Sequence, residues 1–219
     1  MTAAALEFIS VDKRFAKQQV LHGVSLRVEV GESVGLIGLN GAGKTTLIRA
    51  LLDLTQIDAG SINIGAQSHR RTTARADLAY LGERFSPPEF ATGYELIEHL
   101  LRLHQRQPTT LDIAREAGAL ALDVNVLNRP VRTYSKGMAQ KLGLIACILS
   151  GCPLLVLDEP MSGLDPQARA LFKARLNVLR ETGRSVFFSS HLLGDVESLC
   201  DRIVVLDGGH VRWHGRPQD

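Results

Sequence analysis

The sequence is poor in cysteine. Its 219 residues contain three cysteines, Cys147, Cys152 and Cys200. An odd number without the spacing of paired metal ligands argues against a framework of disulfides and against a structural zinc site. We therefore expect the protein to work in a reducing compartment.

No charge of one sign dominates the chain. Lys and Arg total 25 and Asp and Glu total 23, which gives a formal net charge of +2. A protein that binds nucleic acid through its charge normally carries a larger basic excess. We therefore expect no nucleic-acid partner.

Long hydrophobic runs are also missing. The longest stretch without a charged residue, 142–157, is interrupted by Ser-Gly-Cys-Pro, whereas a membrane-spanning helix needs about 20 mostly apolar residues. The first residues have no basic region and Glu7 breaks their apolar run, so we expect no signal peptide. These absences predict a soluble chain, so any role at a membrane must come through a partner.

The chain does contain alternating strand-like and helix-like segments. Apolar residues alternate over the first 30 residues, and a helix is expected from Lys44, with Leu47, Leu51 and Leu54 on one face. Later helices are expected at 140–149 and 166–181, and strands at 33–37, 154–157, 185–189 and 202–206, before a turn at 207–209. This order predicts an α/β fold with a mainly parallel central sheet and an antiparallel N-terminal β layer.

Residues 85–132 have a different character. Two amphipathic stretches, 94–104 and 111–122, predict helices that interrupt the alternation of strands and helices. We interpret the segment as an inserted helical subdomain. The chain is then a single domain, 5–219, whose core consists of residues 5–84 and 133–219.

A glycine-rich loop between a predicted strand and a predicted helix carries the strongest chemical signal. Residues 38–45 read GLNGAGKT and match G-x-x-x-x-G-K-[ST] in full. In this motif the curled backbone and the helix N-terminus bind phosphate oxygens, the lysine reaches the β- and γ-phosphates, and the threonine hydroxyl ligates Mg²⁺. The residues predicted to bind the nucleotide are Gly38, Leu39, Asn40, Gly41, Ala42, Gly43, Lys44, Thr45 and Thr46.

Two acidic residues follow a second apolar strand. Asp158 and Glu159 come directly after 154–157, and the carboxyl end of such a strand lies beside a phosphate loop in open α/β sheets. Asp158 would hold Mg²⁺, and Glu159 could polarise an attacking water as a general base. The sequence therefore predicts, at minimum, a P-loop hydrolase that binds a nucleoside triphosphate.

Three further motifs narrow the class. They are TYSKGMAQ at 133–140, SGLD at 162–165, and His191 after the strand at 185–189. Together with the phosphate loop and the acidic pair, this order resembles the ATP-binding cassette family, the motor subunits of ABC transporters. The resemblance extends from about Leu6 to Arg216 and implies a P-loop NTPase fold with an inserted helical subdomain.

The resemblance also implies roles for individual residues. Ser135 and Gly137, in the signature motif, would contact the γ-phosphate bound to an opposite subunit. Asp165 would join the two sites of a dimer. His191 would hydrogen-bond the γ-phosphate and orient Glu159 and water.

Four further positions can be compared with the family pattern. Phe15 matches the aromatic residue that stacks on adenine. Glu83 occupies the lid position that is usually Gln, and its oxygens can still ligate Mg²⁺. Lys136 and Met138 replace Gly and Gln of the usual signature, and Glu83 with a Tyr-Ser-x-Gly-Met signature is typical of the exporter branch.

The implied function is an ATPase that uses ATP and Mg²⁺ to drive transport, most consistent with an exporter. It would pair with a second copy of itself or a paralogous cassette, and would sit on the cytoplasmic face of the inner membrane through separate transmembrane permease subunits. Exposed aromatics at 85–90 would meet those subunits. The alternatives are a non-transport cassette such as a repair or translation factor, an importer motor, and a nucleotide-gated module without turnover.

Overall fold

The computed structural model describes residues 4–217, and its N-terminal part forms an antiparallel sheet. Four strands take part, in the order β2-β1-β4-β5: β1 (Ala4–Phe15), β2 (Gln18–Glu29), β4 (Ala59–Ile64) and β5 (Gln67–Ser68). Leu6, Phe8 and Val11 of β1 are buried, and the residues between them are half-buried or exposed. One face of this sheet therefore packs inward, as the alternating sequence predicts.

A six-stranded sheet forms the centre of the molecule. Its order is β10-β9-β3-β8-β7-β6, with β3 (Ser33–Ile37), β6 (Leu78–Leu81), β7 (Leu154–Leu157), β8 (Ser185–Ser190), β9 (Arg202–Asp207) and β10 (His210–Gly215). Neighbouring strands are parallel except for the β9–β10 hairpin. The predicted fold class, mainly parallel with an antiparallel N-terminal layer, is confirmed.

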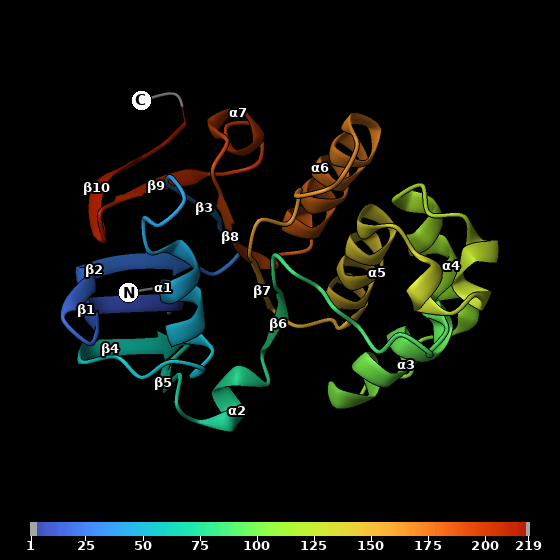
Figure 1. Cartoon of the computed structure of the whole chain (residues 1–219), viewed down its shortest axis with the longest axis horizontal. Helices are drawn as coiled ribbons and strands as arrows, with labels where there is room; N and C mark the ends of the chain where they lie inside the picture. Colours follow the sequence, from blue (N-terminus) through green and yellow to red (C-terminus); the bar gives the residue numbers. More distant parts are fainter. Residues whose placement is uncertain (1–3, 218–219) are drawn as a thin grey trace.

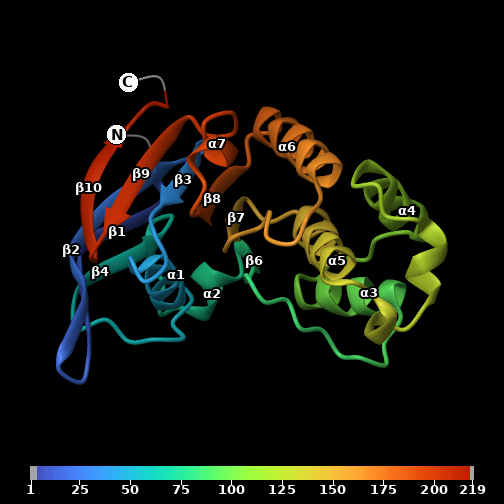
Figure 2. The ribbon, with the colours of Figure 1, turned by 45° about the horizontal axis from the view of Figure 1, so that its top comes forward.

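Helices cover the central sheet and extend the molecule to one side. They are α1 (Lys44–Leu51), α2 (Thr72–Arg75), α3 (Gly93–Leu103), α4 (Thr110–Ala119), α5 (Lys136–Leu149), α6 (Pro166–Glu181) and α7 (Leu193–Val196), with short 3₁₀ turns at Val124–Asn128 and Val131–Thr133. Figures 1 and 2 show α3 and α4 at the end of the molecule opposite the four-stranded sheet, with α5 and α6 between. Residues 85–132 thus contribute α3, α4, the first 3₁₀ turn and all but the last residue of the second.

Three helix boundaries differ from the sequence prediction by three residues or more, and one of them is the end of α4 at Ala119 instead of Leu122. Helix α1 ends at Leu51, Asp53 adopts φ 59°, and Leu54 is 63% exposed, so Leu54 does not continue the buried face. Helix α5 begins at Lys136 because the Ser135 hydroxyl accepts a hydrogen bond from the Met138 N–H and caps the helix. The signature motif therefore runs from the second 3₁₀ turn into the start of α5.

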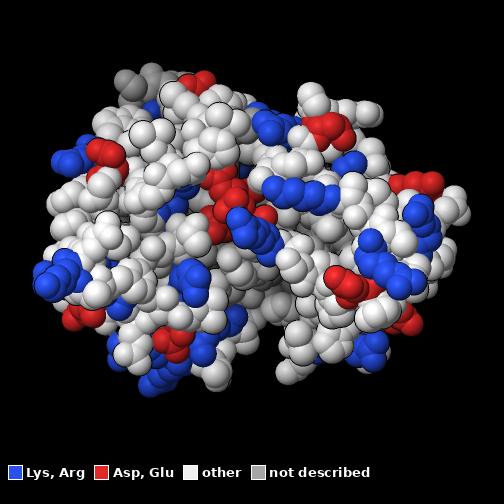
Figure 3. Space-filling view, viewed as in Figure 1, with Lys and Arg blue, Asp and Glu red and all other residues white. Residues whose placement is uncertain are grey.

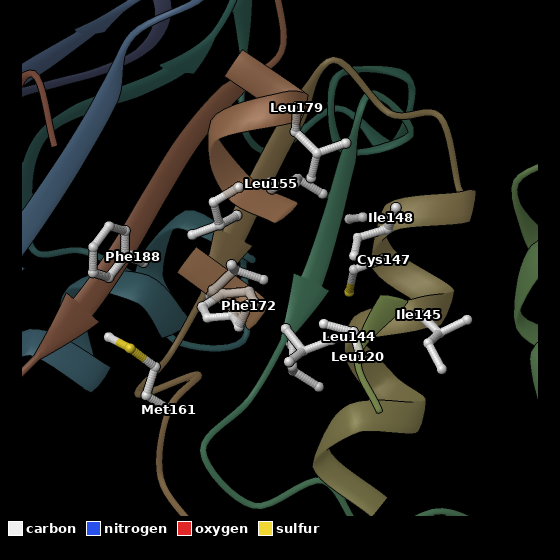
Figure 4. Close-up of a cluster of buried hydrophobic side chains, with 14 of the residues drawn as sticks. Leu120, Leu144, Ile145, Cys147, Ile148, Leu155, Met161, Phe172, Leu179 and Phe188 are labelled. Atoms are coloured by element: carbon white, nitrogen blue, oxygen red, sulfur yellow. The ribbon is translucent and has the colours of Figure 1, made fainter. Parts of the chain in front are cut away.

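Two buried clusters hold these layers together. One lies between the four-stranded sheet, α1 and the central sheet, where the rings of Phe8 and Phe187 are 5.9 Å apart. Figure 4 shows part of the other, in which Leu144 and Ile148 of α5, Phe172 of α6 and Leu155 of β7 point toward one another. The second cluster continues into α3 and α4 and so joins the helical end of the molecule to the central sheet.

The segment 85–90 is less exposed than the sequence suggests. Phe90 is 78% exposed, and the Arg132 guanidinium lies 5.5 Å from its ring centre. Phe85, however, is half-buried and packs against the larger core. Within residues 4–217, no helix combines the length and the apolar character needed to cross a membrane.

Candidate nucleotide-binding site

The phosphate loop, residues 38–45, links the buried strand β3 to α1. Gly43 caps α1 with φ 106°, a backbone conformation that favours glycine. The main chain can therefore curl directly into the helix, and the free N–H groups of its first turn face the loop. This arrangement suits an anion at the N-terminus of α1.

Lys44 curves back over this loop and is 6% exposed. Its Nζ donates a hydrogen bond to the Gly38 carbonyl at 2.6 Å and lies 3.5 Å from Oε1 of Glu159. A buried ammonium is stable where it meets an opposite charge and hydrogen-bond acceptors. Lys44 therefore connects the loop to the acidic pair after β7.

Asp158 and Glu159 are held by a serine from the neighbouring strand. The Ser189 hydroxyl donates to Oδ1 of Asp158 at 2.5 Å and accepts from the Glu159 N–H at 2.9 Å. Asp158 is 1% exposed, and its N–H donates to the Leu81 carbonyl of β6. Glu159 has φ 49°, so its backbone is held in an uncommon left-handed conformation at the edge of the sheet.

His191 completes a chain of contacts around Glu159. Its Nδ1 lies 2.8 Å from Oε2 of Glu159, while the other carboxylate oxygen faces Lys44 at 3.5 Å. The His191 side chain is 47% exposed, whereas that of Glu159 is 12% exposed. The arrangement presents an oriented carboxylate to the cavity, and a general base must lie within hydrogen-bond reach of the proton that it accepts.

The loop and these side chains line one cavity of about 410 Å³. Its lining residues are Val20, Leu39, Asn40, Gly41, Gly43, Lys44, Thr45, Thr46, Glu83, Glu159, Ser162 and His191. The Gly38 carbonyl accepts a hydrogen bond from Lys44, which lines the cavity. Ala42 is buried within the loop. Figure 3 shows acidic side chains gathered near the middle of one face, where the two halves of the molecule meet.

Seven sequence-predicted residues are absent from this lining: Gly38, Ala42 and Asp158 are buried behind it, and four others lie away from it. Phe15, at the end of β1, is 47% exposed, and the Lys13 ammonium lies 5.0 Å from its ring centre. Ser135 and Gly137 are at the start of α5, and Asp165 caps α6 by accepting a hydrogen bond from the Ala168 N–H. That hydrogen bond lowers the pKa of the Asp165 carboxyl below its ordinary value.

The two motifs outside the cavity contact each other. Lys136 Nζ donates to the Ser162 hydroxyl at 3.1 Å, and a Cβ added to Gly137 would lie 2.8 Å from the Gly163 carbonyl. The start of α5 and the turn before α6 are therefore packed as one surface. Ser162 belongs to both this surface and the nucleotide cavity.

The residues expected to hold Mg²⁺ fit that ion only together with a nucleotide. Thr45 and Glu83 line the cavity, and Asp158 is buried with its Oδ1 bound to Ser189. Among the side chains that the structure describes, no group of three His, Cys, Asp or Glu is arranged to hold a metal by itself. Mg²⁺ is usually bound by one or two carboxylates plus substrate phosphates, so this donor set is suitable.

Burial and a nearby charge also shift the pKa of Tyr80, which lies on β6 beside β7. Desolvation, followed by the negative charge of Asp158, raises the pKa of Tyr80 to about 12. The phenol therefore stays protonated at neutral pH.

Three contributors to the site were not identified from the sequence. Ser189 could have been suspected because β8 is parallel to β7, with Leu157 paired to Phe188, which places the next residues side by side. Ser162 stands in the SGLD motif without a role of its own, and Val20 gives no signal in the sequence. Ser189 and Val20 reach the site through long-range packing that no local motif encodes, whereas Ser162 lies in the turn directly after Glu159.

The phosphate loop, the acidic pair after β7 and the parallel sheet between them define a P-loop nucleotide hydrolase. The family profile described as ABC transporter matches residues 21–162. The chain therefore belongs to the ABC transporter family, as an ATP-binding cassette ATPase.

Relatives and solved structures agree with this assignment. The chain is 36% identical to an uncharacterized ABC transporter ATP-binding protein of Bacillus subtilis, covering 97% of this chain and 69% of that protein. A similar uncharacterized protein of Nostoc is 37% identical, covering 89% of this chain and 59% of that protein. The Nod factor export ATP-binding protein I of Rhizobium etli is 34% identical, covering 100% and 70%. The chain thus spans between 59% and 70% of the length of these relatives.

Among solved structures, an ATP binding subunit of an ABC transporter has a TM-score of 0.88 at 31% identity, covering 97% of this chain and 90% of that chain. A dimeric ATP-binding cassette in a post-hydrolysis state, bound to ADP and Pi, has a TM-score of 0.88 at 20% identity, covering 98% and 99%. The second likeness is one of fold.

Proposed function

We propose that this chain is the ATP-hydrolysing motor of an exporter whose membrane-spanning part consists of separate subunits. The observation that carries the proposal is the Glu159 carboxylate, held 2.8 Å from His191 and 3.5 Å from Lys44 at the edge of the phosphate-loop cavity. A carboxylate fixed in this way can accept the proton of a water that attacks the γ-phosphate.

We assign roles to the other site residues from the family pattern and from where they lie around the cavity. The N–H groups of the phosphate loop and Lys44 would bind the β- and γ-phosphates, and His191 would orient Glu159 and the attacking water. Thr45, Asp158 and Glu83 would hold Mg²⁺, which, when bound, supplies positive charge to the phosphate oxygens. Phe15 would stack on the adenine ring from the end of β1.

The site is completed by a second cassette in this proposal. Ser135 caps α5 with its side chain, and Ser135, Gly137 and Asp165 lie outside the chain's own cavity. A helix N-terminus attracts anions, so the start of α5 would bind the γ-phosphate held by a partner cassette. We infer a homodimer, or a pair with a paralogous cassette, that closes on ATP and reopens after hydrolysis.

The exporter assignment draws on the relatives and on Glu83. One of the relatives quoted above is named for Nod factor export, and the glutamate at the lid position agrees with that branch. The permease subunits would anchor the chain to the cytoplasmic face of the inner membrane. The exposed Phe90 and the surface of 85–90 are the proposed docking region.

A tagged pull-down from gently solubilised membranes tests this proposal, with every stoichiometric partner identified by mass spectrometry. We expect a polytopic membrane protein at a one-to-one ratio. Co-purification of an external substrate-binding protein would favour an importer and contradict the exporter assignment. Ribosomal proteins or nucleic acid, with none of the chain on membranes, would favour the non-transport cassette instead.

A further inference from the structure

The turn between β9 and β10 contacts the outer side of the phosphate loop. The Gly209 N–H donates to the Ala42 carbonyl at 3.1 Å, and the Gly209 carbonyl accepts from the His22 N–H at 3.0 Å. One residue therefore ties the loop to β2, whose Val20 lines the nucleotide cavity. In Figure 1 the start of β10, next to this turn, lies beside β2 and the loop that enters α1.

The contact at Gly209 leaves no room for a side chain. Gly209 has φ 77°, and an added Cβ would lie 2.2 Å from the Val20 carbonyl oxygen and 2.9 Å from Cδ2 of His22. The Val20 oxygen belongs to the main chain, so it cannot rotate away. Any side chain would force the turn away from β2 and from the Ala42 carbonyl.

The same hairpin and β2 contact both ends of the loop. A Cβ added to Gly38 would lie 2.3 Å from the Leu206 carbonyl oxygen of β9, and one added to Gly43 would lie 3.2 Å from the Val20 carbonyl oxygen. Inside the loop, the Ala42 N–H donates to the Leu39 carbonyl at 3.1 Å. The curl that directs N–H groups toward the cavity is therefore fixed from outside by β9, the turn and β2.

We propose that Gly209 is a positioning residue for phosphate binding. Through Ala42 it sets the curvature of the phosphate loop, and through His22 it fixes the loop against β2. The proposal rests on the ATP site described above. The adjacent Gly208 provides a matched control, because it shares a positive φ of 52° but an added Cβ there meets no atom within 4 Å.

The test compares Gly209→Ala with Gly208→Ala in the full chain. Trinitrophenyl-ATP and trinitrophenyl-adenosine, titrated by fluorescence, separate phosphate binding from binding of the nucleoside. For Gly209→Ala we expect affinity for trinitrophenyl-ATP to fall by about tenfold, with affinity for trinitrophenyl-adenosine changed by less than about twofold. Gly208→Ala should stay within about twofold of the unsubstituted chain for both probes, because it adds backbone strain without moving the loop.

Two results would overturn the proposal. One is equal affinity of the two variants for trinitrophenyl-ATP, and the other is an equal loss of both probes in Gly209→Ala, which would indicate general damage. Failure of the unsubstituted chain to bind trinitrophenyl-ATP would instead overturn the nucleotide site itself.

Amide hydrogen exchange of the unsubstituted chain gives an independent measurement if Gly209→Ala does not fold. ADP should slow exchange of the Gly209 amide together with the loop amides by at least about threefold, because ordering the loop also orders its bond to Gly209. Unchanged exchange at Gly209, with protected loop amides, would contradict the positioning role.

Discussion

At the scale of single residues, the side chain of Glu159 must meet two requirements of a general base. The carboxylate must be oriented, which the contacts to His191 and Lys44 achieve, and it must accept a proton. Its positive φ is stabilised by the hydrogen bond from its own N–H to Ser189, which also binds Asp158. One serine therefore fixes the backbone of the candidate base and the side chain of a candidate metal ligand.

Replacing Glu159 with Gln tests its role as a base. Glutamine keeps the size of the side chain and can still hydrogen-bond His191, but it cannot accept a proton. We expect ATP turnover to fall by about 10²- to 10⁴-fold, the usual contribution of a general base, while ATP binding is retained because Lys44 loses a competing negative charge. A phosphate-release assay and a nucleotide titration measure the two quantities.

Glu181→Gln is the matched control, since Glu181 is exposed at the end of α6 and outside the cavity. It should turn over ATP like the unsubstituted chain. Normal turnover by Glu159→Gln would show that another group activates the water.

The sequence predicts which residues carry the chemistry of this site better than it predicts which neighbours hold them in place. Lys44, Asp158 and Glu159 stand in motifs whose spacing encodes their position relative to a strand or helix. Ser189 and Val20 belong to the site because β8 and β2 pack beside the loop in three dimensions. No local pattern specifies such neighbours. The sequence therefore identifies the residues that carry the chemistry, but not the residues that hold them in position.

At the scale of secondary-structure elements, one buried ion pair joins α4 to α6. Arg175 donates from Nε to Oε2 of Glu116 at 2.7 Å and from its NH2 group to Oε1 at 2.5 Å. Glu116 is 3% exposed, so its carboxylate has left water and depends on this bidentate contact. The pair therefore holds α4, which belongs to segment 85–132, against α6, the helix that follows Asp158 and Glu159 in the chain.

Removing one partner of this pair should be costly. Arg175→Met leaves the Glu116 carboxylate buried without its partner, and we expect the free energy of unfolding to fall by about 3–5 kcal/mol. The double variant Glu116→Leu with Arg175→Met should recover much of that loss, because no unpaired charge remains. Urea unfolding followed by circular dichroism measures all variants.

Arg115→Met is the control from the same helix. Arg115 is 69% exposed and pairs with Asp112 across one turn, so its loss should change stability by less than about 0.5 kcal/mol. If Arg175→Met were no less stable than Arg115→Met, the ion pair would not hold α4 in place.

Helix prediction succeeded where local signals agree. Thr92 and Thr109 each form a capping box with an acidic residue three positions later, at the start of α3 and α4. The prediction was wrong at the end of α1, where apolar spacing continued to Leu54 but the chain turns at Asp53. Apolar periodicity alone does not show where a helix leaves the core.

At the scale of the whole molecule, the direction of the strands follows from the sequence but their order does not. Alternating strands and helices predict parallel pairing, which β3, β6, β7, β8 and β9 show. The position of β3 between β8 and β9 joins segments far apart in the chain. That order brings the loop after β3 next to residues 189–191 and to the turn after β9.

The candidate site is also divided at this scale. The phosphate loop, Glu159 and His191 line one cavity, whereas Ser135, Gly137 and Asp165 lie on a separate surface of the same chain. A single cassette therefore presents half of each proposed site. A face-to-face pair of two cassettes would bring the halves together around each γ-phosphate.

This arrangement predicts ATP-dependent dimers that depend on the charge at position 135. Glu159→Gln with ATP should sediment as a dimer, because the γ-phosphate is bound but not hydrolysed. Adding Ser135→Asp should keep it monomeric, since Asp still caps α5 but places a negative charge against the partner's phosphate. Adding Ser135→Asn should allow dimers, because Asn caps the helix equally well without the charge. Analytical ultracentrifugation with and without ATP distinguishes them, and equal dimerisation of the Asp and Asn variants would place the start of α5 away from the partner's nucleotide.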